Sequence, residues 1–341
     1  MNSRPGCSKV CDVLQKLVDL KVSDIHLRPS EPVFYRQGGR LFSVRQAVFS
    51  AAEINDFWEQ IAAAPEKTAL QEKKEADFAW LWADSRFRVH AFLVQGQLSL
   101  VFRYILPRIP SLQELGCPAL WQKYVRQKDG LILVCGSTGE GKTTTLASFI
   151  ETVNQQRAAH IFCLEDPVEY LHQSKLSLIS QCEYQKDFFS FAGAVRSALR
   201  ADPDIILLGE LRDRETAEAA LQAAETGHLV LATLHTKSAA DSVDRILNFF
   251  PLSQQNTAAA LLASVLEAVF VQHLVQAKNN RLVCATEIMV RNSAVSNLIR
   301  TGKTAQLVSV LQTGKKYGMQ TMAMAMEELR RKYELEELPD G

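Results

Sequence analysis

The stretch at residues 136–143 constrains the fold of this chain more than any other feature. It reads GSTGEGKT and fits the phosphate-loop pattern G-x-x-x-x-G-K-[ST] at every position. An apolar run at residues 131–135 leads into it, and a segment compatible with a helix begins near Lys142. A strand, a glycine-rich loop and a helix in this order bring backbone N–H groups together where phosphate oxygens can bind. The sequence therefore predicts a nucleotide-binding α/β domain.

Residues of this loop have distinct expected roles. Lys142 is expected to reach the β- and γ-phosphates of ATP, and the Thr143 hydroxyl to bind Mg²⁺. A second GKT, at residues 302–304, has Asn297 where the leading glycine belongs and is predicted to form a turn. The residues expected to surround the nucleotide are Gly136, Ser137, Thr138, Gly139, Glu140, Gly141, Lys142, Thr143 and Thr144.

Three further apolar runs alternate with helical segments after the loop, and each ends in a polar side chain. The runs are residues 161–164, 205–208 and 229–234. Continuous apolar runs separated by helices are typical of a parallel sheet covered on both faces, here a doubly wound domain. The carboxyl ends of parallel strands share one edge, where ligands bind. Glu165, Glu210 and His235 are therefore expected to join the phosphate loop.

These strand-end residues suit phosphoryl transfer, which needs a held metal, an oriented water and stabilisation of developing charge. We assign Glu210 to Mg²⁺ and its surrounding water, and Glu165 to orienting or deprotonating the attacking water. The two roles could be exchanged. His235 is placed to sense the γ-phosphate, and His228, at the other end of the same run, is a further candidate.

The first part of the chain has a different pattern. Apolar residues at helical spacing near residues 10–18 precede two β-favouring runs around Gly38 and Gly39, a hairpin signature, and more strand-rich sequence follows. Residues 1–106 are predicted to form a small α+β domain. Two prolines place a linker at residues 107–112. Residues 113–341 then form the second domain, whose end is helical and increasingly charged.

Composition limits the class of protein. Lysine plus arginine and aspartate plus glutamate each total 38, so no global field draws the chain to nucleic acid, and we expect no nucleic-acid partner. The longest apolar run, residues 258–271, falls short of the ~20 residues that span a bilayer, so no integral membrane segment is expected. The seven cysteines form no C-x-x-C pair, and Cys135 and Cys163 are predicted to be small buried side chains.

Several strings together resemble the secretion-type hexameric ATPases, most closely the PilT-like type IV pilus retraction ATPases. They span most of residues 130–320 in the family's order, and looser agreement in SDIHLRP and RFRVHAF extends the resemblance to nearly the whole chain. The carrying strings are GSTGEGKTTT, LEDPVEY, ALRADPDIILLGELRD, AAETGHLVLATLHTKSAAD, AVSNLIRTGKTAQL and QTGKKYGMQT.

The resemblance implies a RecA-like C-terminal domain, a PAS-like N-terminal domain and a homo-hexamer with Mg-ATP at its interfaces. It also implies a function, pilin disassembly during twitching motility, acting on an inner-membrane platform protein. The expected location is cytoplasmic, peripheral at the inner face of the cytoplasmic membrane. Site residues that the resemblance implies are Glu165 in an aspartate-rich box, Glu210 in the Walker B strand, His228 and His235 in a histidine box, and the site-closing arginines Arg86, Arg88 and Arg103.

Alternatives remain open beside pilus retraction. Extension and type II secretion relatives carry a further N-terminal domain and a four-cysteine zinc motif, for which this chain has no room. The chain departs from the family pattern at three places: Lys237 replaces a threonine, His90 replaces an asparagine, and an arginine before Arg103 is missing.

An ATPase for pilus or pseudopilus assembly or for secretion is one alternative, and a low-turnover paralogue sharing a ring with another ATPase subunit is a second. A nucleic-acid translocase is a third.

Overall fold

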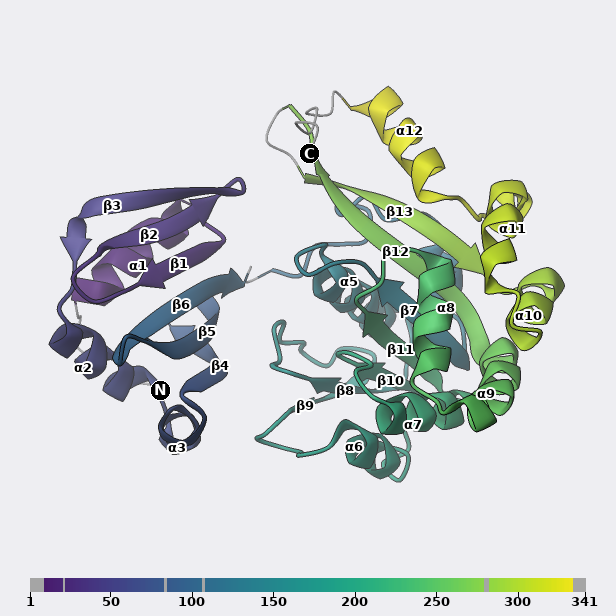
Figure 1. The fold of residues 1–341 in the computed structure, drawn as a ribbon, viewed down its shortest axis with the longest axis horizontal. Coiled ribbons are helices and arrows are strands. Elements are labelled where there is room, and N and C mark those ends of the chain that lie inside the picture. The colour runs from purple at the N-terminus through teal and green to yellow at the C-terminus, as the bar shows by residue number, and fades with distance from the viewer. Residues whose placement is uncertain (1–8, 21, 83–84, 106–107, 279–281, 334–341) are drawn as a thin grey trace. The chain divides into compact units, whose positions relative to one another are not determined.

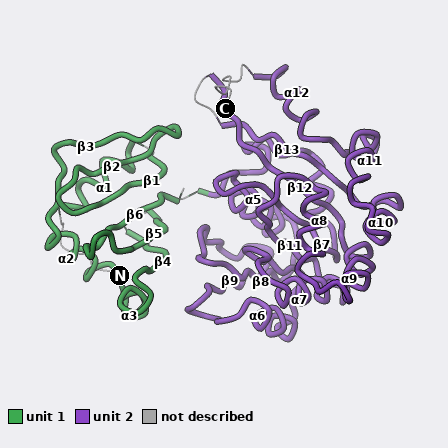
Figure 2. The backbone as a smooth tube through the Cα atoms, viewed as in Figure 1, with its two compact units in different colours: residues 1–108 green, residues 109–341 purple. Residues whose placement is uncertain are grey.

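The computed structural model describes residues 9–20, 22–82, 85–105, 108–278 and 282–333. The chain divides into two compact units, residues 1–108 and 109–341 (Figure 2). The division falls inside the predicted linker, whose residue 107 lies outside the described ranges. Each unit is considered by itself below.

The first unit is an antiparallel sheet with three helices. Its strand order is β3-β2-β1-β6-β5-β4. The predicted hairpin at Gly38 and Gly39 is confirmed: both have positive φ, 56° and 77°, which glycine adopts without strain. The elements are α1 (Lys9–Asp19), β1 (Asp24–Leu27), β2 (Pro32–Gln37), β3 (Arg40–Val48), α2 (Ala51–Ile61), α3 (Ala64–Lys73), β4 (Glu75–Trp82), β5 (Ser85–Val94) and β6 (Gln97–Ile105).

The second unit is built on a seven-stranded sheet in the order β13-β12-β7-β11-β10-β8-β9 (Figure 1). Its first elements are α4 (Trp121–Val125), β7 (Gly130–Cys135), α5 (Lys142–Gln156), β8 (His160–Glu165), β9 (Leu178–Glu183), α6 (Phe191–Ala198), β10 (Ile205–Leu208), α7 (Arg214–Glu225) and β11 (Leu229–Leu234). Then follow α8 (Ala239–Asn248), α9 (Leu252–Val265), β12 (Leu266–Gln276), β13 (Leu282–Val290), α10 (Ser293–Arg300), α11 (Leu307–Thr313) and α12 (Met322–Lys332).

The sheet is parallel except at one edge, where β13 runs antiparallel to β12. A close succession of two strands permits only the antiparallel pairing, because a parallel pair needs a long crossover. The apolar run at residues 258–271 is also two elements, since α9 ends at Val265 and β12 begins at Leu266. None of the helices in the described ranges combines the length and apolar composition that crossing a membrane requires.

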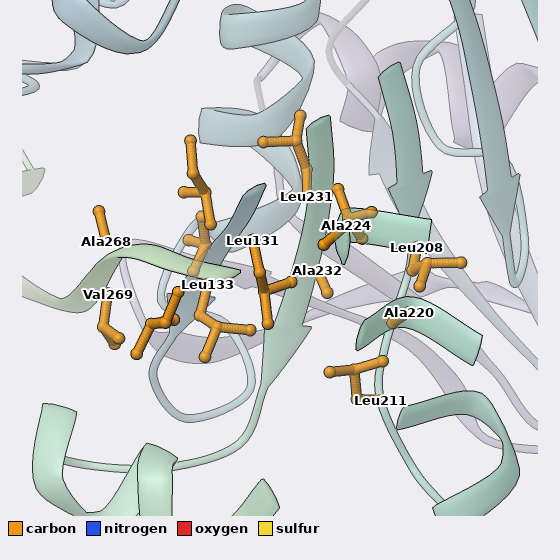
Figure 3. Packing of buried hydrophobic residues seen from close by; sticks show 14 of the residues in the cluster. Leu131, Leu133, Leu208, Leu211, Ala220, Ala224, Leu231, Ala232, Ala268 and Val269 are labelled. Carbon is orange, nitrogen blue, oxygen red and sulfur yellow. The ribbon is translucent and has the colours of Figure 1, made fainter. Parts of the chain in front are cut away.

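Burial explains why the central strands are continuous apolar runs. Every residue of β7, β10 and β11 is buried, because helices cover both faces of these strands. The alanine-rich α7 packs against β7 and β11, and its small side chains Ala220 and Ala224 lie near Leu231 and Ala232 (Figure 3). Cys135 and Cys163 are buried, as predicted, and burial raises the pKa of both thiols.

The C-terminal segment is helical as predicted, with α12 lying along β13 (Figure 1). The second GKT is a turn at Gly302, as predicted, and a short 3-10 helix (Thr304–Gln306) follows it. Residues 334–341, the end of the predicted charged helix, lie outside the described residues.

Candidate active site

The loop after β7 has a backbone that glycine alone accommodates. Gly136, Gly139 and Gly141 have φ of 139°, 87° and 76°, in the left-handed region. A Cβ on Gly136 would lie 2.6 Å from the carbonyl oxygen of Gln272 in β12. The glycine spacing in the motif is thus a packing requirement of the loop against its neighbouring strand.

The loop presents hydrogen-bond donors that the protein leaves open. Within the described residues, the backbone N–H groups of Gly139, Gly141, Lys142 and Thr143 have no protein acceptor. No side chain caps the N-terminus of α5 either. Orphan donors at a helix N-terminus, together with the helix dipole, favour an anion with several oxygens. These features fit a phosphate group.

Lys142 folds back over this loop. Its Nζ donates to the carbonyl oxygens of Gly136 and Ser137 at 2.7 and 2.9 Å. The residue is only 8% exposed, and burial lowers the pKa of its amine. Lys142 therefore sits among acceptors that a phosphate oxygen can replace.

A chain of polar side chains runs from Lys142 across the carboxyl edge of the sheet. Lys142 Nζ lies 3.3 Å from His235 Nδ1, and His235 Nε2 lies 3.4 Å from Glu210 Oε1. Arg212 Nε donates to Glu210 Oε2 at 2.7 Å, and its Nη1 donates to Asp166 Oδ2 at 3.2 Å. The two ring nitrogens of His235 therefore face different neighbours, Nδ1 the Lys142 amine and Nε2 the Glu210 carboxylate. Four separate elements thus form one connected network.

Sequence reasoning missed two members of this network, Arg212 and Asp166. Arg212 lies just before α7, which begins at Arg214. The available signal was a cation two positions after the acid that ends β10. Partial burial is the largest single influence and lowers the pKa of Arg212, but the hydrogen bonds and charges of Glu210 and Asp166 together raise that pKa above its usual range, so the cation persists at this edge.

Glu165 lies at a small pocket beside the loop. The pocket has a volume of about 30 Å³, enough for a water molecule. The Glu165 side chain is buried, and its Oε1 accepts a hydrogen bond from Gln181 Nε2 at 3.0 Å. The residues that line the pocket are Thr143, Leu146, Ala147, Glu165, Tyr170, His172, Leu207, Gly209 and Thr233. A carboxylate and the hydroxyl-bearing Thr143 therefore share a space in which water can be held.

Two of the expected nucleotide-binding residues have side-chain contacts with other segments. The Glu140 carboxylate accepts from the backbone N–H of Leu274, and it lies 3.1 Å from His273 Nδ1. Thr144 Oγ1 lies 3.0 Å from the hydroxyl of Tyr170. Sequence spacing could not reveal these contacts, because β12 and residues 168–177 are distant from the loop in the chain.

His228 lies at the opposite edge of the sheet. It precedes β11, and its carbonyl oxygen accepts from the backbone N–H of Gly130, where β7 begins. Its Nδ1 lies 3.0 Å from the carbonyl oxygen of Ala223, in the last turn of α7. The phosphate loop follows the other end of β7, so the structure does not bring His228 to the network of His235 in the same chain.

The three candidate arginines belong to the first unit. Arg88 Nε donates to both carboxylate oxygens of Asp77 at 3.1 Å, and Arg103 Nε donates to Asp24 Oδ1 at 2.9 Å. Arg88 and Arg103 lie directly opposite each other on β5 and β6. Two like charges at such positions repel each other and lower stability unless acidic neighbours such as Asp77 and Asp24 offset them. Arg86 lies on β5, opposite Ile105. Their part in closing a nucleotide site stays a prediction.

A phosphate loop between a buried parallel strand and a helix, with acids at the ends of adjacent strands, defines the class of P-loop nucleoside triphosphatases. The whole chain narrows this class further. A model of the family described as type II/IV secretion system protein matches residues 7–336, and the chain belongs to that family.

Relatives within the family share most of their length with this chain. A twitching motility protein of Neisseria gonorrhoeae is 43% identical over 87% of this chain and 80% of its own length. An uncharacterised protein of Escherichia coli, YggR, is 41% identical over 93% of this chain and 96% of its own. The type IV pilus retraction ATPase PilT of Pseudomonas aeruginosa is 39% identical over 90% of each.

A solved structure supports the same relationship. The crystal structure of the pilus retraction motor PilT with bound ADP superposes with a TM-score of 0.86 at 36% identity. The match covers 96% of this chain and 94% of that one. The predicted α/β fold with a smaller α+β unit is therefore confirmed.

Proposed function

We propose that this protein is a motor ATPase that couples ATP hydrolysis to the retraction of type IV pili. The observation that carries the proposal is the likeness to a retraction motor along nearly the whole chain. The phosphate loop and the network from Lys142 to Glu210 supply the chemistry that such a motor needs.

In the proposed site, the open N–H groups of the loop and Lys142 bind the β- and γ-phosphates. Mg²⁺, when bound, neutralises charge on these phosphates, and the Thr143 hydroxyl and the Glu210 carboxylate are the oxygen donors that would hold it. Glu165 orients the attacking water in its pocket and takes its proton. The products are ADP and inorganic phosphate.

His235 is proposed to sense the γ-phosphate. Lys142 contacts His235 while it donates to the loop carbonyls. When Lys142 turns to phosphate, His235 loses that contact, and its position beside Glu210 is free to change. The state of the nucleotide is thereby passed to Glu210 and Arg212.

The assembly is proposed to be a homo-hexamer in the cytoplasm, bound at the inner face of the cytoplasmic membrane to a pilus platform protein. A ring places nucleotide sites near neighbouring subunits. In this proposal Arg86, Arg88 and Arg103 of a neighbour supply positive charge to the site. In the subunit, Arg88 is paired with Asp77 and Arg103 with Asp24.

The test replaces the loop lysine. In purified protein, Lys142→Ala removes a cation from the developing charge, and we expect hydrolysis to fall about 100-fold or more. A matched control is Lys237→Ala, which changes an exposed lysine two residues after His235, the histidine beside Glu210. Normal hydrolysis by Lys142→Ala would overturn the site.

The cellular test distinguishes retraction from its alternatives. Surface pili are counted in cells that carry Lys142→Ala in place of the native protein. More pili that no longer shorten would support retraction, whereas loss of pili would show that the ATPase powers assembly. A native protein that hydrolyses ATP only when mixed with another ring subunit would be an accessory paralogue.

A further inference from the structure

Gln181 lies on the edge strand β9, and among the described residues its side-chain amide is hydrogen-bonded only to those that line the pocket at Glu165. Its Nε2 donates to Glu165 Oε1 at 3.0 Å and to the carbonyl oxygen of Tyr170 at 2.8 Å. Its Oε1 accepts from the backbone N–H of His172 at 2.9 Å. Carbonyl and carboxylate oxygens accept and a backbone N–H donates, so these neighbours allow only one orientation of the amide.

The two backbone contacts of Gln181 attach it to residues 168–177, which we call the strap. The strap connects β8 to β9 and runs along α5. Tyr170 contacts Thr144 in the first turn of α5, and Asn154 near its other end is bonded to Gln173 and Lys175. The N-terminus of α5 is the phosphate loop. Gln181 therefore links the pocket carboxylate to a segment fixed on the phosphate-binding helix.

Sheet register explains how Gln181 reaches Glu165. β8 and β9 are parallel, with Gln181 opposite Cys163 and Glu183 opposite Glu165. Side chains two positions apart on a strand point to the same face, so Gln181 and Glu165 are diagonal neighbours on one face. A long amide side chain spans that diagonal, whereas a shorter one would not.

We propose that Gln181 is a positioning residue for ATP hydrolysis, holding the Glu165 carboxylate toward the pocket and in register with the strap. The inference rests on the proposed role of Glu165 in the ATPase reaction. A buried carboxylate with several rotamers needs a fixed donor to point one oxygen at a water molecule. Gln181 supplies that donor from a strand, where its own backbone is held by β8.

The test compares two substitutions at Gln181 with a control that loosens the strap alone. Gln181→Glu keeps the shape but replaces the donor with a second carboxylate, and Gln181→Leu removes all three hydrogen bonds. Asn154→Ala removes two strap contacts without touching Glu165. Lys175→Ala, at an exposed strap residue bonded to Glu151, serves as the control if Asn154→Ala does not fold.

We expect both Gln181 variants to lower kcat about tenfold or more, because the general base is misplaced. The Kd for ADP should stay within about twofold, since the phosphate loop is unchanged. The strap control should keep kcat within about twofold of the native protein. Equal loss in the control and in the Gln181 variants would show that order in the strap, rather than Gln181, matters, and would overturn the proposal.

The pH dependence of kcat should not change if Gln181 has only a structural role. A second carboxylate beside Glu165 raises the pKa of that carboxyl pair, so the acidic limb of kcat should move to higher pH in Gln181→Glu. Tyr170 and His172 are the other titratable groups at the pocket, and His172 is paired with Glu151 of α5. All three are retained in the strap control, whose acidic limb should match that of the native protein.

The Glu165→Gln variant separates failure of this proposal from failure of the proposed function. If Glu165→Gln hydrolyses ATP at the native rate, the role of Glu165 is wrong and Gln181 has nothing to position. If Glu165→Gln is inactive while both Gln181 variants keep native kcat and pH profile, only the positioning role is overturned. If the proposal holds, adding Gln181→Leu to Glu165→Gln causes no further loss.

Discussion

The two ends of β11 carry two histidines in opposite circumstances. At the carboxyl end, His235 lies between the side chains of Lys142 and Glu210, and 42% of its side chain is exposed. At the amino end, His228 Nδ1 lies near the carbonyl oxygen of Ala223 in the last turn of α7 and near the hydroxyl of Thr226. One histidine contacts charged groups that a ligand can engage, and the other contacts the neutral groups that end a helix. The kind of partner, more than the residue type, separates a site from scaffold.

The same contrast holds for other residues at the amino and carboxyl ends of the parallel strands, which form the amino edge and the carboxyl edge of the sheet. At the amino edge, the backbone N–H of His160 donates to Asp204, and its ring contacts the carbonyl oxygens of Ala201 and Asp202. At the carboxyl edge, charged side chains contact one another through Arg212. An anionic ligand such as phosphate competes directly for the charged side chains at the carboxyl edge. Two pairs of substitutions test this difference, and a fifth substitution tests a smaller effect of pH.

Two left-handed glycines provide the sharpest test. Gly136→Ala at the carboxyl edge adds a Cβ 2.6 Å from a backbone carbonyl of β12, whereas Gly227→Ala at the amino edge meets nothing within 4 Å. Both pay a conformational cost of about 1–3 kcal/mol in the free energy of unfolding. Only Gly136→Ala should also abolish ADP binding, because the loop must shift. Calorimetric titration and urea unfolding measure both effects, and ADP binding by Gly136→Ala at native affinity would contradict the loop geometry.

Alanine at each histidine gives the next largest difference. His235→Ala removes the imidazole that lies between Lys142 and Glu210, and we expect kcat to fall about 10- to 100-fold. His228→Ala should leave kcat in the isolated subunit nearly unchanged and lower the free energy of unfolding by about 1 kcal/mol, the value of a lost hydrogen bond. Steady-state hydrolysis and urea unfolding compare the two variants. A large loss of kcat in His228→Ala would show that the amino edge takes part in catalysis.

The smallest effect concerns pH. Burial lowers the pKa of His172 below 6.5, so the folded protein resists protonation there more than the unfolded chain does. The unfolded chain then binds more protons, and stability contributed by neutral His172 is present above pH 6.5 and falls as pH drops through the folded pKa. Urea midpoints at about pH 5.5 and about pH 7.5 should differ less in His172→Gln than in the native protein. If the urea midpoints of the variant and the native protein depend equally on pH, a group other than His172 causes the pH dependence.

Much of the second unit could be predicted because its signals are local. The apolar runs at residues 205–208 and 229–234 coincide with β10 and β11, and α5 begins at Lys142 as expected. A strand buried on both faces must be apolar throughout, and a phosphate loop must be followed by a helix. The antiparallel edge at β13 was missed, because an apolar run does not reveal the direction of its pairing.

Contacts within the site were harder to predict. Arg212 and Gln181 hold the two strand-end glutamates, yet neither belongs to a recognised spacing. Glu140 lies inside the motif, but its side chain contacts Leu274 of β12. The contacts of Gln181 with Glu165 and of Glu140 with Leu274 join different strands and loops, so they depend on strand order, whereas Arg212 lies only two residues after Glu210.

By itself, the sequence determined which strand ends carry chemistry. A buried strand must be apolar, so a charged residue directly after it lies at an edge. Only the tertiary structure decided that Lys142, His235, Glu210 and Arg212 form one connected network while His228 does not. The physical reason is the strand order, in which β11 pairs with β7 on one side and β10 on the other. That order brings distant carboxyl ends within hydrogen-bonding distance and leaves the amino end of β11 on the opposite edge.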